Sequence, residues 1–290
     1  MRLIHLTDPH LTTPPPWQSL FGRSHSGKRF LGYASWARKR RFSLRRAWLD
    51  ELTAEVARLA PDQLLITGDL TQIGTAEEIA EARDWLTQLQ VPGKISFVPG
   101  NHDSYAAESW PTLYREWSDF LPEAGAGGFP TVRRLGDVAI FGLSSAVPTR
   151  PLSACGLIGD AQLARFEQTL AEHRDAFRFL LLHHPPLPDM ISFRKRLRDA
   201  PALAEMLSRE PVDVILHGHR HTNQSSERQG AKVYCTAPAS AEAGSFRVFD
   251  LEPVASGWQV QMSLRQRSVD GQRLAFETVE SADWVVSGPG

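Results

Sequence analysis

Cysteine is scarce in this chain, which has two cysteines, Cys155 and Cys235, among its 290 residues. Two thiols are more typical of small core residues than of a disulfide in a reducing compartment, so we expect neither to have a functional role. Long apolar runs are also missing, because no segment approaches the roughly twenty residues that a membrane-spanning helix needs. The short apolar run after Met1 is not followed by the small-residue cleavage site of a signal peptide. We therefore expect a cytoplasmic protein.

Net charge is nearly absent as well, since 32 Lys and Arg stand against 33 Asp and Glu, giving a formal net charge of −1. This balance argues against a general nucleic-acid binder, and we expect no specific nucleic-acid partner. With 42% hydrophobic and 22% charged residues, the chain suits an α/β protein with a substantial core. It contains no evident linker or internal repeat, so we expect a single domain over residues 1–290. The composition leaves the oligomeric state open.

Acidic residues are missing from one segment in particular, because no Asp or Glu lies between Leu11 and Leu49. We call residues 11–48 the insert, and its cations and aromatic rings alternate along the chain. The cations are Arg23, Lys28, Arg29, Arg38, Lys39, Arg40, Arg41, Arg45 and Arg46. The aromatic residues are Trp17, Phe21, Phe30, Tyr33, Trp36, Phe42 and Trp48.

Short apolar runs that each end in Asp, Asn or His predict buried strands of a parallel sheet. These expected strands cover residues 3–6, 64–69, 95–98, 177–182 and 212–216. Helical spacing is found at residues 41–59, 75–89, 160–173 and 201–208, and Thr75 with Glu78 is placed as a capping box. We expect surface helix and loop over residues 104–130 and a hairpin from residues 131–135 and 138–143. Antiparallel strands are expected at residues 232–235, 245–251, 258–267 and 274–279, with a turn at Asp270-Gly271.

Ligand-type side chains stand at the ends of the five expected buried strands. They are Asp8 and His10, then Asp69, then Asn101 and His102, then His183, and finally His219 and His221. The carboxyl ends of strands in an α/β sheet converge at one edge, which is where ligands bind in this architecture. Carboxylate, imidazole and amide groups together suit Mn, Fe or Zn better than Ca. The sequence therefore predicts a site for divalent metal ions, in which Asp69 is placed to bridge two cations.

Taken in order, these motifs resemble those of the calcineurin-like metallophosphoesterases. They stand here as Asp8-Pro9-His10, Gly68-Asp69, Gly100-Asn101-His102-Asp103, His183 and Gly218-His219-Arg220-His221. The resemblance implies an α/β fold, a four-layer αββα sandwich in which helices flank two mixed sheets. It also implies two divalent metal ions, one held by Asp8, His10, Asp69 and His221 and the other by Asp69, Asn101, His183 and His219.

The resemblance further implies catalytic roles for His102, near the scissile phosphate, and for Asp103, which would orient His102. Two metals joined by a bridging carboxylate lower the pKa of a shared water to about 7 and clamp the phosphoryl oxygens. The resulting hydroxide would attack phosphorus in line, with no protein nucleophile. A His102 imidazolium would stabilise charge on the phosphoryl oxygens or protonate the leaving alkoxide.

Within the family, the motifs most resemble the bacterial branch of class III cyclic-nucleotide and glycerophosphodiester phosphodiesterases. We therefore expect hydrolysis of a phosphodiester in a small molecule or nucleotide. One alternative is a hydrolase of a nucleotide-linked lipid, similar to the UDP-diacylglucosamine hydrolases, although those enzymes usually carry Arg where this chain has His102. A nuclease is a second alternative. A non-catalytic scaffold is a third, and the complete set of ligand positions disfavours it.

The insert directly follows Asp8-Pro9-His10, so we expect it beside the metal site. Trp36, Arg40 and Arg41 are then expected to contact substrate, as is His184, a wall of the site next to the expected ligand His183. The insert would form a lid over a large anionic substrate, or a patch resting on anionic lipid headgroups at the inner membrane. The alternative is a solvated basic helix whose aromatic residues pack on the domain.

Overall fold

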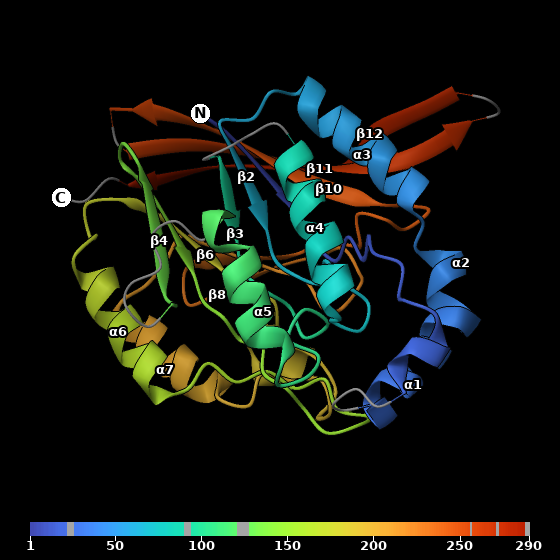
Figure 1. Ribbon diagram of the computed structural model, residues 1–290. Coiled ribbons are helices and arrows are strands. Elements are labelled where there is room, and N and C mark those ends of the chain that lie inside the picture. Colours follow the sequence, from blue (N-terminus) through green and yellow to red (C-terminus); the bar gives the residue numbers. More distant parts are fainter. Residues whose placement is uncertain (22–25, 90–93, 121–127, 256, 271–272, 288–290) are drawn as a thin grey trace.

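The structure is a computed structural model that describes the chain apart from residues 22–25, 90–93, 121–127, 256, 271–272 and 288–290. Two six-stranded sheets lie face to face, and helices cover the outer face of each sheet (Figure 1). The expected α/β sandwich of two mixed sheets between helices is therefore confirmed. Arg23 and Gly271, both singled out above, lie outside the described residues.

The first sheet has the strand order β12-β11-β10-β1-β2-β3. Three parallel strands and three antiparallel strands make it up: β1 (Arg2–Leu6), β2 (Gln63–Ile66), β3 (Ile95–Phe97), β10 (Ser245–Val254), β11 (Gly257–Asp270) and β12 (Arg273–Ser287). The parallel strands are almost completely buried, as their continuous apolar runs predict. Because β10 pairs with β1, the first and last parts of the chain share this sheet.

The second sheet has the strand order β4-β5-β6-β7-β9-β8. Its strands are β4 (Thr131–Leu135), β5 (Val138–Gly142), β6 (Phe177–Leu181), β7 (Val214–His217), β8 (Gln224–Arg228) and β9 (Ala231–Cys235). β4 and β5 form the expected antiparallel hairpin. The sequence did not predict β8, whose residues are all polar. It lies at the edge of the sheet, paired with β9, where its side chains are partly or fully exposed to solvent.

Helices α3 (Arg46–Arg58) and α4 (Ala76–Gln88) pack on the first sheet, and α6 (Asp160–Ala171) and α7 (Ala200–Arg209) pack on the second (Figure 1). α5 (Ser109–Glu116) lies beside α4. The capping box at the start of α4 is confirmed, with the Glu78 amide donating to the Thr75 hydroxyl and Glu78 Oε2 accepting from the Thr75 amide at 3.0 Å. Short 3-10 turns form η1 (Trp17–Leu20), η3 (Ser118–Phe120) and η4 (Pro188–Met190).

The main hydrophobic core fills the space between the two sheets. Phe179 of β6 and Phe249 of β10 are fully buried there, with ring centroids 5.5 Å apart. Burying one such side chain stabilises the fold by about 1.5–3 kcal/mol. Cys155 and Cys235 are free, buried thiols, as expected.

The insert is helical over most of its described length. α1 (Ser26–Ser35), the π-helical turn η2 (Trp36–Arg40) and α2 (Arg41–Ser43) follow one another without a break. Leu20, Phe30 and Tyr33 of the insert pack against Ile73 and Tyr105 of the sandwich. Part of the insert's aromatic surface therefore anchors it to the rest of the chain.

The structure corrects the helix expected over residues 41–59. Leu44 and Arg45 are extended, with φ values of −128° and −126°, and α3 begins after them. Leu44 forms a β-bridge with Ala241, and the Arg45 amide donates to the Ser240 carbonyl at 2.8 Å. These long-range contacts satisfy backbone groups that a continuous helix would have used, and helical spacing in a sequence cannot reveal them.

Candidate metal centre

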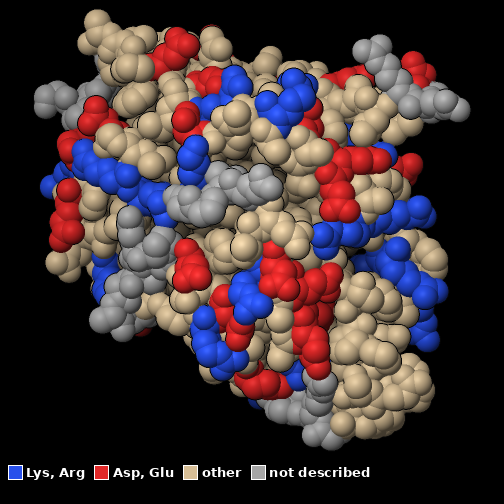
Figure 2. Space-filling model, turned by 45° about the horizontal axis from the view of Figure 1, so that its top comes forward, with Lys and Arg blue, Asp and Glu red and all other residues tan. Residues whose placement is uncertain are grey.

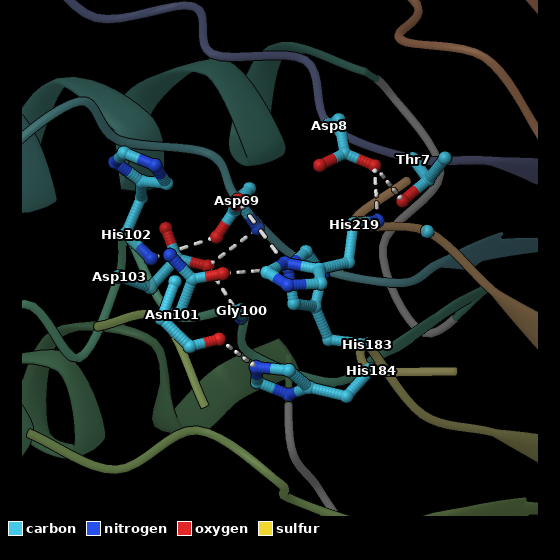
Figure 3. A network of polar contacts seen from close by, with 12 residues as sticks. Thr7, Asp8, Asp69, Gly100, Asn101, His102, Asp103, His183, His184 and His219 are labelled. Atoms are coloured by element: carbon cyan, nitrogen blue, oxygen red, sulfur yellow. Dashed lines mark hydrogen bonds and ion pairs between the residues drawn. The ribbon is translucent and has the colours of Figure 1, made fainter. Parts of the chain in front are cut away.

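The expected ligand side chains converge beyond the carboxyl ends of strands from both sheets (Figure 3). β1, β2 and β3 of the first sheet precede the loops that carry Asp8, Asp69 and Asn101. β6 and β7 of the second sheet lead to His183 and His219. The site is therefore assembled from the neighbouring edges of two sheets rather than from the edge of one open sheet.

The backbone of the site adopts a rarely populated conformation. Positive φ values of 50°, 41°, 59°, 67° and 58° occur at Asp8, His10, Asp69, His219 and His221. Non-glycine residues pay about 1–3 kcal/mol for such conformations, which persist where the surrounding structure enforces them and which cluster at functional sites. Five of the eight non-glycine residues with positive φ in the described part of the chain are thus expected metal ligands.

Gly218 allows the end of β7 to approach Asp8 closely. A Cβ atom at Gly218 would collide with Thr7 Oγ1 and Asp8 Oδ2. Asp8 Oδ2 accepts from the Thr7 hydroxyl at 2.8 Å and from the His219 amide at 3.0 Å. Asp8 Oδ1 is buried and has no hydrogen-bond partner among the described residues, so it remains available to a ligand.

One group of candidate ligands consists of Asp8, His10, Asp69 and His221, whose ligand atoms lie within 4.8 Å of one another. Asp8 Oδ1 is 3.2 Å from His221 Nε2 and 3.9 Å from His10 Nε2. The Thr71 carbonyl accepts from His10 Nδ1 at 3.1 Å, which turns His10 Nε2 into the site, where it is buried without a hydrogen-bond partner among the described residues. Backbone bonds of this kind are how proteins fix the metal-facing nitrogen of a histidine.

The second group consists of Asp69, His183 and His219. His183 Nδ1 donates to the Thr67 carbonyl at 2.7 Å, and His219 Nε2 donates to the Lys195 carbonyl at 3.0 Å. When the two rings are neutral, His183 Nε2 and His219 Nδ1 therefore present lone pairs. These two nitrogens lie only 3.2 Å apart.

Oxygen atoms of Asn101 and Asp69 meet at the same point. His183 Nε2 is 3.2 Å from Asn101 Oδ1 and 3.3 Å from Asp69 Oδ2. Acceptors that face one another repel unless a positive charge lies between them. This set of donors fits a divalent cation, and Asp69 is the residue that both groups share.

Electrostatics at the site favour positive charge. Burial by itself lowers the pKa of His183, but Asp69 and Asp8 outweigh burial and raise the pKa to about 9, so that without a metal a proton on His183 Nε2 supplies the positive charge between these acceptors. Burial opposes ionisation of Asp69, yet the charge of His183 holds the pKa of its carboxyl well below the usual value. Burial lowers the pKa of His10 to about 4. The site therefore presents an ionised Asp69 beside the neutral imidazole of His10.

Asp103 holds together the loops that carry the ligands. Its Oδ2 accepts from the amides of Asp69 and Gly100, both at 2.8 Å, and its Oδ1 accepts from the Thr71 amide at 3.0 Å. Burial, followed by the charge of Asp69, raises the pKa of Asp103 to about 7. The carboxylate thus contacts backbone amides in place of the expected contact with the His102 ring, and it positions the backbone around Asp69.

His102 is oriented by a carbonyl and by a cation. Its Nδ1 lies 2.6 Å from the Gln72 carbonyl, so this nitrogen carries the proton. Arg40 Nη1 lies 3.1 Å from His102 Nε2, and because a guanidinium donates only, Nε2 must accept. Burial holds the pKa of His102 well below its usual value, and Arg40 lowers it further. In this arrangement the ring is neutral, and the expected His102 imidazolium stays a prediction for the enzyme with substrate bound.

Arg40 is the residue through which the insert reaches the site. Its Nη2 donates to the Gly32 carbonyl at 3.1 Å, and its Nε is buried without a hydrogen-bond partner among the described residues. No carboxylate of the described chain forms an ion pair with it. Burial lowers the pKa of Arg40, while the charges of Asp69 and Glu78 oppose that change. A mostly buried guanidinium without an ion pair is well suited to binding an anion.

His184 forms a wall beside the second group of ligands. Its ring centroid lies 4.5 Å from that of His219. Its Nδ1 forms a hydrogen bond with Ser145 Oγ at 2.8 Å, and the Ala154 carbonyl accepts from its Nε2 at 3.1 Å. Both ring nitrogens are thus engaged, so the ring is not available as a metal ligand.

Arg41 and Trp36, also expected at the substrate, are placed away from the ligand side chains. The Arg41 guanidinium lies over the Phe42 ring at 4.5 Å, and Trp36 packs on Tyr33 with centroids 5.4 Å apart. Both contacts are made within the insert itself. Of the insert residues expected at the substrate, Arg40 is the one that the structure brings to the site.

Residues of the site that the sequence analysis missed include Gln72, Ser145 and Lys195. Gln72 and Lys195 act through backbone carbonyls, which orient His102 and His219. Ser145 acts through a hydroxyl next to the end of β5. Carbonyl contacts do not depend on residue type, so no sequence signal identifies them.

Residues 1–223 match the calcineurin-like phosphoesterase family. The chain belongs to this family. The matched segment contains every candidate ligand from Asp8 to His221. The chain is therefore a metal-dependent phosphoesterase, and the ligand sets above are the residues that fit its metal.

Bacterial phosphodiesterases are similar to this chain. A probable cyclic nucleotide phosphodiesterase of Rhodococcus erythropolis is 29% identical over 177 residues, which are 60% of this chain and 56% of that protein. The 3',5'-cyclic adenosine monophosphate phosphodiesterase CpdA of Escherichia coli strain K12 is 24% identical over 277 residues, 89% of this chain and 84% of that protein.

A solved structure supports the fold. The inner membrane complex anchor GAP50 of Plasmodium superposes with a TM-score of 0.56 at 12% identity, covering 100% of this chain and 89% of that one. At this identity the likeness concerns the fold alone. Within the part of the chain that the structure describes, no helix has the length and apolarity needed to cross a membrane.

Proposed function

We propose that this enzyme hydrolyses a phosphodiester bond in a small molecule or nucleotide, with two divalent metal ions that share Asp69. The observation that carries the proposal is the set of facing acceptors at His183 Nε2, His219 Nδ1, Asn101 Oδ1 and Asp69 Oδ2. When bound, Mn, Fe or Zn ions supply Lewis acidity that activates water at neutral pH and neutralises phosphoryl charge. The imidazoles of both groups are already turned to receive them by backbone carbonyls.

Arg40 and His102 are proposed to hold the substrate phosphate. Arg40 Nη1 donates to His102 Nε2 at 3.1 Å, and a phosphoryl oxygen that approaches the two residues would accept from the same guanidinium. The neutral His102 ring, fixed by the Gln72 carbonyl, keeps Arg40 aimed at the site. Arg40 thereby supplies the positive charge that faces the phosphate. Asp103 positions the backbone of Asp69 and Gly100 without contacting substrate.

A cyclic nucleotide is the first candidate substrate. The similar proteins from Rhodococcus and Escherichia coli are described as phosphodiesterases of cyclic nucleotides, which supports this choice. A nucleotide-linked lipid and a single-stranded nucleic acid are the alternatives, and each would use the same chemistry. His184, as a wall beside His219, is proposed to contact the part of the substrate that lies next to the second metal group.

The test is a rate comparison on enzyme freed of metal and reconstituted separately with Mn, Fe and Zn. We expect bis(p-nitrophenyl) phosphate to be cleaved faster than p-nitrophenyl phosphate, followed by turnover of cyclic AMP or cyclic GMP. Faster cleavage of the monoester would contradict the assignment as a phosphodiesterase. Diester cleavage with turnover of the UDP-linked lipid, and none of a cyclic nucleotide, would replace the first candidate substrate with the lipid.

A further inference from the structure

The insert buries or pairs some of its cations and exposes the others. Lys28 and Arg29 are buried, Arg40 contacts His102, and Arg46 forms ion pairs with carboxylates. The remaining cations of its described part are exposed and have no recorded ion pair with a carboxylate: Arg38, Lys39, Arg41 and Arg45. The insert itself contains no acid that could neutralise these charges.

Large apolar side chains of the insert are exposed beside these cations. Leu31 is 51% exposed and Phe42 is 54% exposed. Trp17 is 45% exposed and Phe21 is 63% exposed, with their rings 5.6 Å apart and Phe21 next to Phe30 of α1. Exposed apolar side chains gathered in one short segment are unusual for a surface that faces only water.

The exposed residues follow one side of the continuous helix from α1 to α2. Exposure recurs every four residues, at Gly27, Leu31, Ser35, Lys39 and Ser43. Figure 2 shows Lys and Arg side chains gathered on the right of the molecule, next to a protruding lobe of uncharged residues, and Figure 1 places α1 and α2 on that side. The surface is therefore a convex helical face with apolar and cationic side chains.

We propose that this outer insert face, formed by Trp17, Phe21, Leu31, Arg38, Lys39, Arg41, Phe42 and Arg45, docks the enzyme onto an anionic membrane surface. Cations beside exposed Trp, Phe and Leu are the composition of helices that lie in the headgroup region, where the apolar side chains enter the lipid and the cations meet anionic headgroups. Arg40 leaves the same helix toward His102, so docking would bring the catalytic site close to the lipid surface.

A membrane suits this face better than a nucleic acid does. Single strands are bound in grooves, with aromatic rings stacked on bases. The outer insert face is convex rather than grooved, and Leu31 has no ring to stack on a base. The complementarity that remains is with a flat, negatively charged and partly apolar surface.

The test is co-sedimentation of the full chain with vesicles of phosphatidylcholine alone or with 30% phosphatidylglycerol. We expect binding to the anionic vesicles at low salt and its loss at high salt, because the attraction falls off within a Debye length. Replacing three cations in R38Q/K39Q/R45Q should weaken binding by about tenfold or more. The apolar variant L31S/F42S should weaken binding even at low salt.

A matched control removes the same charge from the opposite side of the molecule. R134Q/R174Q/R209Q replaces three exposed cations near α6 and α7, far from the insert (Figure 1), and should bind vesicles as the unmodified chain does. Hydrolysis of bis(p-nitrophenyl) phosphate without vesicles should be equal in all of these variants, which shows that each has folded.

Several outcomes would overturn the proposal. They are equal binding to neutral and anionic vesicles, unchanged binding of R38Q/K39Q/R45Q, or equal weakening by the control variant. Binding of a single-stranded oligonucleotide in place of vesicles would assign the face to nucleic acid. A dimer that L31S/F42S dissociates, without vesicle binding, would assign it to a second copy of the chain. Vesicle binding is read separately from turnover, so the proposal stands or falls independently of the proposed function.

Discussion

Arg40 Nη1 lies 3.1 Å from His102 Nε2, although the two residues are 62 positions apart in the chain. This contact joins the insert to the loop that follows β3, and it places a guanidinium at the edge of the candidate metal centre. Three of the predictions below depend on this contact or on the residues that support it.

Replacing Arg40 should remove phosphate binding without removing metal. We expect Arg40→Gln to lower the turnover of bis(p-nitrophenyl) phosphate by about 100-fold, because one donor aimed at developing charge in a buried site contributes about that much. Metal content, measured by elemental analysis, should stay unchanged. Arg38→Gln, an exposed change on the same helix, is the control and should retain full turnover. Equal rates in both variants would show that Arg40 does not contact the substrate.

Arg40 and His102 should act as one unit. His102→Ala is expected to keep its metal and to lose turnover, because the ring that aims Arg40 is gone. In a double-mutant cycle the combined loss should be smaller than the product of the two single losses, since each substitution already breaks the shared contact. Rates of the four proteins on one diester measure the coupling, and independent effects would contradict the arrangement.

Metal stoichiometry should distinguish the shared ligand from the others. Asp69→Asn is expected to lose both metal ions, because Asp69 belongs to both ligand groups. Asn101→Ala and His219→Ala should each lose one ion and nearly all turnover. Elemental analysis after gel filtration counts the ions per chain. Two ions retained in Asp69→Asn would exclude a bridging role.

Glu78 should couple stability to catalysis. Its buried carboxylate accepts from the Thr12 hydroxyl at 2.8 Å and from the amides of Gln72 at 2.8 Å and Thr75 at 3.0 Å, which fixes the loop whose Gln72 carbonyl orients His102. Glu78→Ala should lower the free energy of unfolding by about 2 kcal/mol or more, as several charge-assisted bonds are lost. Denaturant titration measures the loss. The exposed change Asp84→Asn should stay within about 0.5 kcal/mol.

Lys28 should make the free energy of unfolding depend on pH in the alkaline range. Its Nζ donates to the Tyr105 carbonyl at 2.7 Å, and burial, with a smaller effect of Arg29, lowers the pKa of Lys28 to about 8, against 10.5 for an ordinary lysine. Between these two values the unfolded chain binds more protons than the folded chain, so the contribution of Lys28 to stability rises with pH. Denaturant titrations at pH 7, 8, 9 and 10 should show the chain gaining stability relative to Lys28→Met. A constant difference would contradict the shifted pKa.

Much of the sandwich and of its ligand set follows from local sequence. Residues 64–66 and 95–97 are strands because continuous apolar runs satisfy burial on both faces, and each run is followed by candidate metal ligands. The capping box of Thr75 and Glu78 was predictable because its residues are three apart and need no distant partner. β8 was not predictable from its sequence. Its polar residues adopt an extended backbone because they pair with β9.

The break between α2 and α3 shows the same limit. Leu44 and Arg45 have neighbours compatible with a helix, and their extended backbone is held by Ala241 and Ser240, almost 200 residues further along the chain. Contacts over such separations leave no trace in local spacing.

The sequence by itself determined the candidate metal ligands of this protein, because each one follows a strand or lies in a motif whose position along the chain defines it. Tertiary structure decided which cations of the insert serve the site and which face outward. Successive side chains on a helix point about 100° apart, so Arg40 and Arg41 cannot be told apart by position alone. The packing of Leu20, Phe30 and Tyr33 against Ile73 and Tyr105 fixes the rotation of the helix, which turns Arg40 toward His102 and leaves Arg41 on the surface.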